Sequence, residues 1–188
     1  ADILERASYR QNPSAVTAVM HQQPSLNAEA AAAISSDRVL VLVELEKPGN
    51  IGALLRTADA AGFTAVLLVD IALDIYNPNI IRSSTGACFL NNIYHLSRDE
   101  AVTFLKSHAY QIAAGHLKGT QALFDLDFSG PVAIVLGAED RGLDDSWVEA
   151  CDTLVKIPMV GQLSDSLNVS ISGAIFMYEA LRQRWPSA

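Results

Sequence analysis

Residues 39–45, with the sequence VLVLVEL, constrain the fold more than any other part of the chain. The run is almost continuously apolar and rich in valine. That pattern is typical of a strand buried on both faces of a parallel sheet, not of a strand with one face in water. Further strand patterns are predicted at residues 65–69, 92–96, 111–114, 132–136 and 153–157.

Helical patterns lie between these strands. Apolar spacing predicts a helix that begins near residue 51 and ends at Gly62, a second over 99–106 and a short third over 144–150. A long C-terminal helix is predicted from residue 167. Strands that alternate with helices predict an α/β fold with a mainly parallel sheet flanked by helices. The expected buried stripe of the C-terminal helix comprises Leu167, Ile171, Ala174, Ile175, Tyr178 and Leu181.

Composition excludes several classes of protein. Half of the 188 residues are hydrophobic and 18% are charged, which excludes a disordered chain, and no apolar run approaches the roughly 20 residues of a membrane helix. Cys88 and Cys151 lack paired spacing, and the four histidines are scattered, so we expect a cytoplasmic protein with no metal. The net charge of −8 argues against indiscriminate nucleic-acid binding, so any such contact must be local.

The length predicts one main domain over residues 37–188. Residues 1–36 combine short helical patterns, at 2–10 and 28–34, with turn formers, and they predict a helical lead-in to that domain. The chain begins at Ala1, which leaves open both a processed protein and a piece of a longer one.

Three loops follow the ends of predicted strands, at residues 46–50, 137–142 and 158–166. In open α/β sheets, ligands bind at the carboxyl ends of the strands, so this edge is the expected site. Glu139 lies between Gly137 and Gly142, where glycine permits a tight turn or a close approach of the backbone to a ligand. Arg56 projects away from the apolar stripe of its helix, so the core does not require it.

Two common enzyme classes fit this edge poorly. The turn at residues 49–52 lacks the GxGxxG pattern of a dinucleotide-binding dehydrogenase, and no GxxxxGK[ST] phosphate loop is present. Ser164 and Ser166 lie in no GxSxG elbow, which argues against a serine hydrolase.

Together the three loops resemble the sequence motifs of the SpoU/TrmH branch of the SPOUT methyltransferases. Residues 50–63 are similar to the first motif, 136–143 to the second, and 157–159 with 166–170 to the third, in the same order and spacing. The resemblance implies transfer of a methyl group from S-adenosyl-L-methionine to a ribose 2′-hydroxyl of structured RNA. It also implies a C-terminal trefoil knot and a homodimer.

The resemblance also implies a role for individual residues. Residues 77–86 are similar to a segment found more often in the rRNA-type members, which favours rRNA over tRNA as the substrate. The expected catalytic group is Arg56, surrounded by Asn50, Glu139, Ser166 and Asn168. The expected cofactor contacts, made largely through backbone groups, are Leu136, Gly137, Ile157, Met159 and Leu167. The expected RNA contacts are Arg82, Ser84 and Thr85.

The chemistry of methyl transfer suits these residue types. A guanidinium can orient a phosphate and stabilise a developing oxyanion, whereas its pKa above about 12 makes it a poor proton acceptor. Glu139 or a phosphate relay remains as the proton route. The family also contains members with an extra N-terminal RNA-binding domain, so residues 1–36 are expected to be a remnant or linker of such a region.

One alternative has the same fold. A catalytically silent protein could bind S-adenosylmethionine or RNA as an assembly module. The joint presence of Asn50, Arg56, Glu139, Ser166 and Asn168 favours the enzyme. The sequence does not determine which RNA, which nucleotide position or which base is involved.

Overall fold

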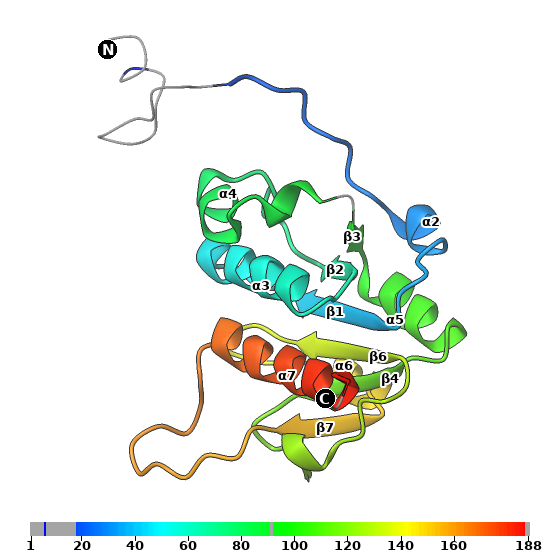
Figure 1. Ribbon diagram of the computed structural model, residues 1–188, viewed down its shortest axis with the longest axis vertical. Helices are drawn as coiled ribbons and strands as arrows, with labels where there is room; N and C mark the ends of the chain where they lie inside the picture. Colours follow the sequence, from blue (N-terminus) through cyan, green and yellow to red (C-terminus); the bar gives the residue numbers. More distant parts are fainter. Residues whose placement is uncertain (1–5, 7–17, 91, 187–188) are drawn as a thin grey trace.

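The computed structural model describes residues 6, 18–90 and 92–186, and within them a seven-stranded sheet has helices on both faces (Figure 1). The strand order is β3-β2-β1-β6-β4-β7-β5, and every neighbouring pair is parallel. The predicted parallel α/β fold is therefore confirmed. The strands are β1 (Arg38–Val43), β2 (Ala65–Val69), β3 (Ile93–Leu96), β4 (Gln111–Gly115), β5 (Gln121–Ala122), β6 (Val132–Leu136) and β7 (Thr153–Lys156).

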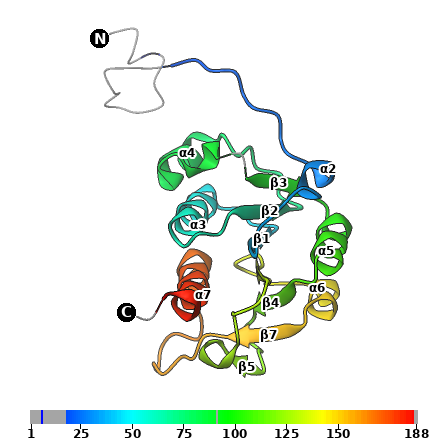
Figure 2. The same cartoon turned by 45° about the vertical axis from the view of Figure 1, so that its right-hand side comes forward.

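Helices α3, α4 and α7 cover one face of this sheet, and α5 and α6 cover the other (Figure 2). The predicted helices after β1, after β3 and at the C-terminus are present within a few residues of their expected bounds. Helix α4, the short β5 and both 3-10 helices were not predicted. The helices are α2 (Ala28–Ala31), α3 (Pro48–Ala60), α4 (Pro78–Ser84), α5 (Arg98–Ser107), α6 (Asp145–Ala150) and α7 (Val169–Arg184), with 3-10 helices η1 (Ala87–Phe89) and η2 (Leu123–Asp125).

Strand β1 lies between two hydrophobic cores. Leu40 and Leu42 belong to the core under α3 and α7, whereas Val39 and Val41 belong to the core under α5 and α6. All four side chains are 0% exposed. Successive side chains of a strand point to opposite faces, so a strand covered on both sides needs apolar residues throughout.

The strand order reverses at β1. β2 lies on one side of β1 and β6 on the other, so the loops that follow β1 and β6 leave the carboxyl edge of the sheet as neighbours. Such a reversal opens a crevice in α/β sheets because the two connecting chains diverge to opposite sides. The motif loops at 46–50 and 137–142 are the two that meet here.

The predicted buried stripe of α7 is correct at Ile175, which packs partly against the core, and wrong at Ile171 and Tyr178. Ile171 and Tyr178 are 52% and 50% exposed, and the buried face is instead formed by Gly173, Phe176, Met177, Glu179 and Ala180. Apolar residues surround most of this helix, so three- and four-residue spacing fits more than one face. The packing of α7 on α3 and β6 decides which one is buried.

The face of α7 that carries Gly173 is buried because only this face permits close contact with α3 and β6. A Cβ atom built on Gly173 would lie 2.3 Å from Leu54 Cδ2 and 2.8 Å from Leu136 Cδ1, so no larger residue fits there without rearrangement. Helix α7 therefore approaches α3 and β6 through a residue without a side chain.

The lead-in is partly described. The helical pattern at 28–34 is confirmed as the short α2, and the His95 N–H donates to the Leu26 carbonyl at 2.8 Å along β3. The pattern at 2–10 lies almost wholly outside the described residues. The knot stays a prediction. No helix within the described part of the chain is long and apolar enough to cross a membrane.

Polar contacts fasten the end of α7 to the body of the domain. Arg184 Nε donates to the Phe128 carbonyl at 2.7 Å, its Nη2 donates to the Gly130 carbonyl, and its Nη1 lies 2.5 Å from Asp37 Oδ2. Gln183 Oε1 accepts from the Phe128 N–H at 2.8 Å. One turn of α7 thus satisfies backbone groups of the loop before β6 and reaches the residue before β1.

We expect Arg184→Ala to lower the free energy of unfolding by about 2 kcal/mol, because it removes charge-assisted hydrogen bonds from a side chain that is only 15% exposed. Arg98→Ala is the matched control, since its ion pair with Asp99 is exposed to solvent, and its effect should be much smaller than that of Arg184→Ala. Urea unfolding of both variants provides the measurement. Equal midpoints for the two variants would contradict the proposed fastening of α7.

Candidate active site at the carboxyl edge of the sheet

Helix α3 begins directly after the loop that follows β1. Pro48 occupies its first turn, where a missing N–H costs nothing, and the Lys47 side chain does not cap the helix. The side chains of Lys47 and Asn50 are instead directed to Glu139, on the loop after β6.

The loop after β6 is held tight by its two glycines. A Cβ atom on Gly137 would lie 2.5 Å from the Gly142 backbone, and Gly142 has a φ of 71°, which favours glycine. The Gly142 N–H donates to the Ala138 carbonyl at 2.9 Å, which closes the turn around Glu139. The backbone of this loop can therefore approach a ligand with no side chain in between.

One hydrogen-bonded cluster joins all three motifs. Glu139 accepts from Lys47 Nζ through one carboxylate oxygen and from Asn50 Nδ2 through the other. Asn50 Oδ1 in turn accepts from Asn168 Nδ2 at 3.4 Å. Asn168 also begins α7, because its Oδ1 accepts from the Ser170 N–H at 2.9 Å. Three of the five predicted catalytic residues are thus in direct contact.

Lys47 belongs to this cluster although no role was predicted for it. The signal available in the sequence was its position in the loop after the first strand, at the edge of the sheet where Glu139 also lies. The Lys47 side chain is 69% exposed and the Glu139 side chain is 19% exposed, so the pair links the loops after β1 and β6 at the surface.

Arg56 and Ser166 do not contact the cluster. Arg56 lies on α3 about 9 Å along the helix from Asn50, given a rise of about 1.5 Å per residue. Its side chain is exposed and has no hydrogen-bond or ion-pair partner within residues 18–90 and 92–186. The exposed Ser166 hydroxyl donates only to its neighbour, Asp165 Oδ1, at 3.4 Å.

The five predicted cofactor residues fall into two groups. Leu136 is 2% exposed and packs near Gly115 and Gly173, so it and Gly137 can offer a ligand only backbone groups. Ile157 packs partly against the core, whereas Met159 and Leu167 are 37% and 38% exposed.

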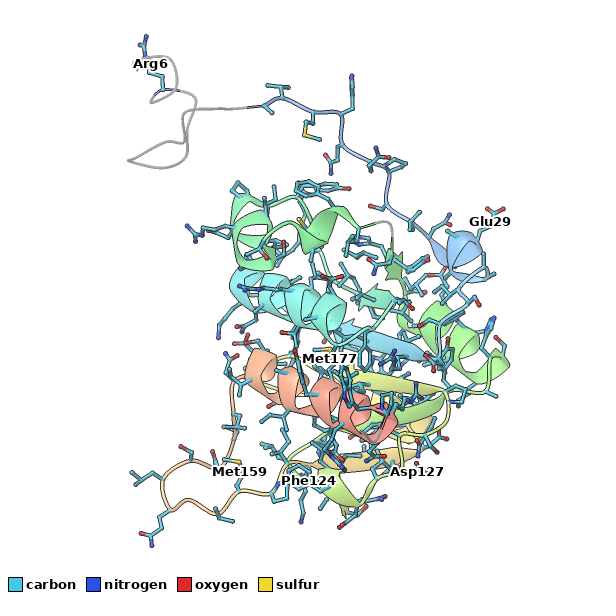
Figure 3. The ribbon with its side chains drawn as sticks, viewed as in Figure 1. Arg6, Glu29, Phe124, Asp127, Met159 and Met177 are labelled. Atoms are coloured by element: carbon cyan, nitrogen blue, oxygen red, sulfur yellow. The ribbon has the colours of Figure 1, made fainter. Side chains whose placement is uncertain are left out.

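The exposed members lie on the loop between β7 and α7, which projects from the body of the domain and carries Met159 (Figure 3). Residues 157–167 of this loop make no backbone hydrogen bond with the rest of the described chain outside regular strands. The loop supplies apolar side chains and free backbone groups at the same edge of the sheet as the Gly137 turn, and a purine-bearing ligand requires such groups.

The predicted RNA contacts lie on α4 and the turn after it. Arg82 is exposed, with its Nη2 donating to Asn79 Oδ1 at 2.9 Å, and Thr85 is exposed with a left-handed φ of 51°. Ser84 departs from expectation because it is 0% exposed. Its hydroxyl donates to the Ile81 carbonyl at 3.2 Å and accepts from the Cys88 N–H at 3.4 Å, so it holds α4 to η1 and presents no surface to RNA.

Helix α4 lies against the start of α3. A Cβ atom on Gly52 would lie 1.9 Å from Ser83 Oγ and 2.8 Å from the Ile80 carbonyl oxygen. Ser83 Oγ is also 3.5 Å from the Pro48 carbonyl oxygen. This close contact brings the end of α4 beside the turn that carries Lys47 and Asn50.

Neither cysteine is a candidate nucleophile. Cys88 is 2% exposed, and burial, reinforced by the charge of Asp152, raises the pKa of the Cys151 thiol to about 12. Among the described residues, no three His, Cys, Asp or Glu side chains lie together as a metal site would require.

An acidic cleft opens on the opposite face of the sheet, towards α5 and α6. It encloses about 290 Å³ at the carboxyl ends of β1 and β2. Asp144 is the N-cap of α6, and hydrogen bonds from the Ser146 hydroxyl and the Trp147 N–H lower the pKa of its carboxyl. The charged lining residues of the cleft are Glu44, Asp70, Arg98, Asp99 and Asp144.

Comparison with known proteins gives consistent matches. The sequence model of the SpoU rRNA Methylase family matches residues 37–178. The chain is 37% identical over 143 residues to a 23S rRNA (uridine(2479)-2'-O)-methyltransferase of Streptomyces viridochromogenes, covering 73% of this chain and 50% of the relative. It is 36% identical over 149 residues to the 23S rRNA (guanosine-2'-O-)-methyltransferase RlmB of Pseudomonas putida, covering 78% and 59% respectively.

Solved structures agree with these matches. The AdoMet-bound rRNA methyltransferase from Sinorhizobium meliloti superimposes with a TM-score of 0.80 at 27% identity, covering 88% of this chain and 63% of that one. The chain spans little more than half the length of the two sequence relatives.

Gly52→Ala should destabilise the protein by roughly 1–2 kcal/mol. The new methyl group forces α3 and α4 apart, and the free energy lost in this way exceeds the gain from the higher helix propensity of alanine. Gly49→Ala is the control in the same helix, since a Cβ there meets no atom within 4 Å. We expect Gly49→Ala to be neutral or stabilising by up to about 1 kcal/mol. Thermal and urea unfolding of both variants test this, and a neutral Gly52→Ala would refute the close contact.

Proposed function

Because the chain belongs to the SpoU rRNA methylase family, we propose that it transfers a methyl group from S-adenosylmethionine to a ribose 2′-hydroxyl of RNA. The cluster of Lys47, Asn50, Glu139 and Asn168 carries this proposal, because it joins the three motif loops at the strand-order reversal. We favour rRNA over tRNA as the substrate, since both sequence relatives described above are named as 23S rRNA enzymes.

S-adenosylmethionine, when bound, supplies a methyl group activated by the positive charge of its sulfonium. The Gly137 turn would hold it through backbone groups, and Ile157, Met159 and Leu167 would cover its apolar surface. This fits the tight glycine turn and the exposed apolar side chains at the same sheet edge. The loop after β7 would then close over the ligand.

The protein must align the ribose hydroxyl and stabilise the charge that develops on its oxygen. As the oxygen forms its bond to the methyl carbon, the carbon–sulfur bond breaks and the hydroxyl proton must leave. We assign phosphate orientation and oxyanion stabilisation to Arg56, whose guanidinium has no partner in the described part of the chain. Ser166 lies on the loop after β7, where its hydroxyl is exposed.

Glu139 is the proposed proton route within the protein, with a relay through a substrate phosphate as the alternative. Lys47 and Asn50 bind its two oxygens and hold the carboxylate at the mouth of the crevice. Asn168 secures Asn50 and begins α7, so the third motif positions the first. On this account Asn50 and Asn168 act by positioning Glu139.

Arg56→Ala should retain affinity for S-adenosylmethionine within about threefold but lose methyl transfer by at least roughly 100-fold, as expected for the loss of one oxyanion donor. Calorimetry with the cofactor and a tritiated-methyl assay on protein-free rRNA measure the two quantities. Lys106→Ala removes an exposed cation from α5, on the opposite face, and should leave both unchanged. Retained turnover in Arg56→Ala would refute the role of Arg56.

We further propose a homodimer formed through α7. On the face of this helix that was predicted to be buried, Ile171 and Tyr178 are 52% and 50% exposed, and Leu167, in the loop just before the helix, is 38% exposed. Large apolar side chains on one helix face are costly to leave in water and are typical of an interface. A second copy, presenting the same face, satisfies the closed symmetry of most homodimers.

Tyr178→Glu should weaken this dimer at least about 30-fold, because it places a charge on the apolar face of α7. Thr103→Glu introduces the same charge at an exposed position of α5 and should leave the association unchanged. Sedimentation velocity over a range of concentrations distinguishes the two. Identical sedimentation of both variants and the wild type would rule out an interface at this face.

Residues 1–36 are proposed to be the linker to, or remnant of, an N-terminal RNA-binding region. In support, Gln22 Nε2 donates to Asp74 Oδ1 at 3.3 Å and Leu26 extends the edge of the sheet beside β3. A segment attached in this way would hold such a region near α4.

A further inference from the structure

Two aromatic side chains stack on one another at the surface beside α4. The Tyr76 and Phe89 ring centroids are 5.6 Å apart with 21° between the ring planes. Tyr76 lies two residues before α4, and Phe89 ends η1. The turn at Thr85 and Gly86, with φ values of 51° and 99°, reverses the chain between these elements and brings the two rings together.

Tyr76 packs partly against the core, whereas Phe89 does not belong to it. Phe89 is 51% exposed although Tyr76 covers one face of its ring, and the next residue, Leu90, is 43% exposed. The adjoining crevice, lined by Tyr76, Leu90 and His95, encloses only about 20 Å³, room for about one water molecule. A flat ligand could therefore stack on the outer face of Phe89 but could not insert beneath it.

The aromatic pair and the proposed active site both adjoin helix α4. Helix α4 separates them, and its seven residues span about 10 Å, or roughly three stacked nucleotides. Ser83 at the far end of α4 touches the start of α3, next to Lys47 and Asn50. Arg82 lies between, exposed and held along the helix by Asn79, where it can meet a phosphate.

We propose that Tyr76 and Phe89 form a stacking platform for an unpaired base of the RNA substrate, a few nucleotides from the methylated ribose. The outer face of Phe89 receives the base, and Tyr76 holds the Phe89 ring in place. Exposed aromatic rings bind single-stranded RNA in this manner, and stacking requires no particular base. This inference rests on the proposed methyl transfer to RNA, and it adds the requirement that the RNA be unpaired next to the target.

The test uses a fluorescein-labelled single-stranded RNA of 12 nucleotides and protein-free rRNA. Phe89→Ala should weaken binding of the oligonucleotide roughly 5- to 150-fold, the range for loss of one base–aromatic stack, and raise KM for rRNA with kcat nearly unchanged. Phe89→Trp should restore binding to within about twofold. Phe124→Ala is the control, because Phe124 is 58% exposed on η2.

Salt dependence separates stacking from charge. Phe89→Ala should leave the slope of log affinity against log salt unchanged, whereas Arg82→Ala should make it shallower by about 0.7, the value for one phosphate contact on a single strand. A 2-aminopurine base in the oligonucleotide should be quenched by the wild type and by Phe89→Trp, and not by Phe89→Ala.

The outcomes distinguish this inference from the proposed function. Methyl transfer by the wild type with unimpaired RNA binding by Phe89→Ala would refute the platform and leave the enzyme in place. RNA binding that depends on Phe89, without methyl transfer by the wild type, would support the platform and refute the enzyme. Absence of oligonucleotide binding by the wild type would also overturn the platform. A change of oligomeric state in both Phe89→Ala and Phe89→Trp would overturn it as well, and would show that Phe89 contacts another protein chain instead.

Discussion

The burial of β1 on both faces is the constraint on which the rest of the structure depends. Helices must cover both sides of this strand, so the chain continues from β1 to one side and later returns to the other through β6. The loops after these two strands therefore leave the same edge as neighbours. The contact of Lys47 and Asn50 with Glu139 follows from this topology, although about 90 residues of chain separate them.

Two glycines allow the helices on one face to come close enough to link the sites. Gly52 allows α4 to pack closely against the start of α3, and Gly173 allows α7 to pack closely against α3 and β6. As a result, helix α4, which is proposed to meet RNA, ends beside the same turn at which helix α7 begins. A methyl group at either glycine would meet atoms closer than 3 Å, so the geometry of the crevice depends on two residues that have no side chain.

Charge divides the carboxyl edge into two sides. Arg56 and Arg82 are exposed on the face covered by α3 and α4, whereas Glu44, Asp70, Asp99 and Asp144 line the cleft on the face covered by α5 and α6. In a chain with a net charge of −8, the acidic side repels a polyanion and the few exposed cations attract it locally. An acidic protein can thereby offer RNA one face without binding it indiscriminately.

The sequence by itself determined the class of the sheet and every strand except the short β5, because buried strands leave local patterns. It also identified Asn50, Glu139 and Asn168 through motifs that only together are specific. The tertiary structure decided which face of α7 is buried, that residues 78–84 form a helix, that Ser84 is enclosed and that Lys47 is paired with Glu139. These features depend on contacts between residues distant in sequence. The local spacing of residues does not show which apolar face of a helix packs against the core, or which polar side chains become partners.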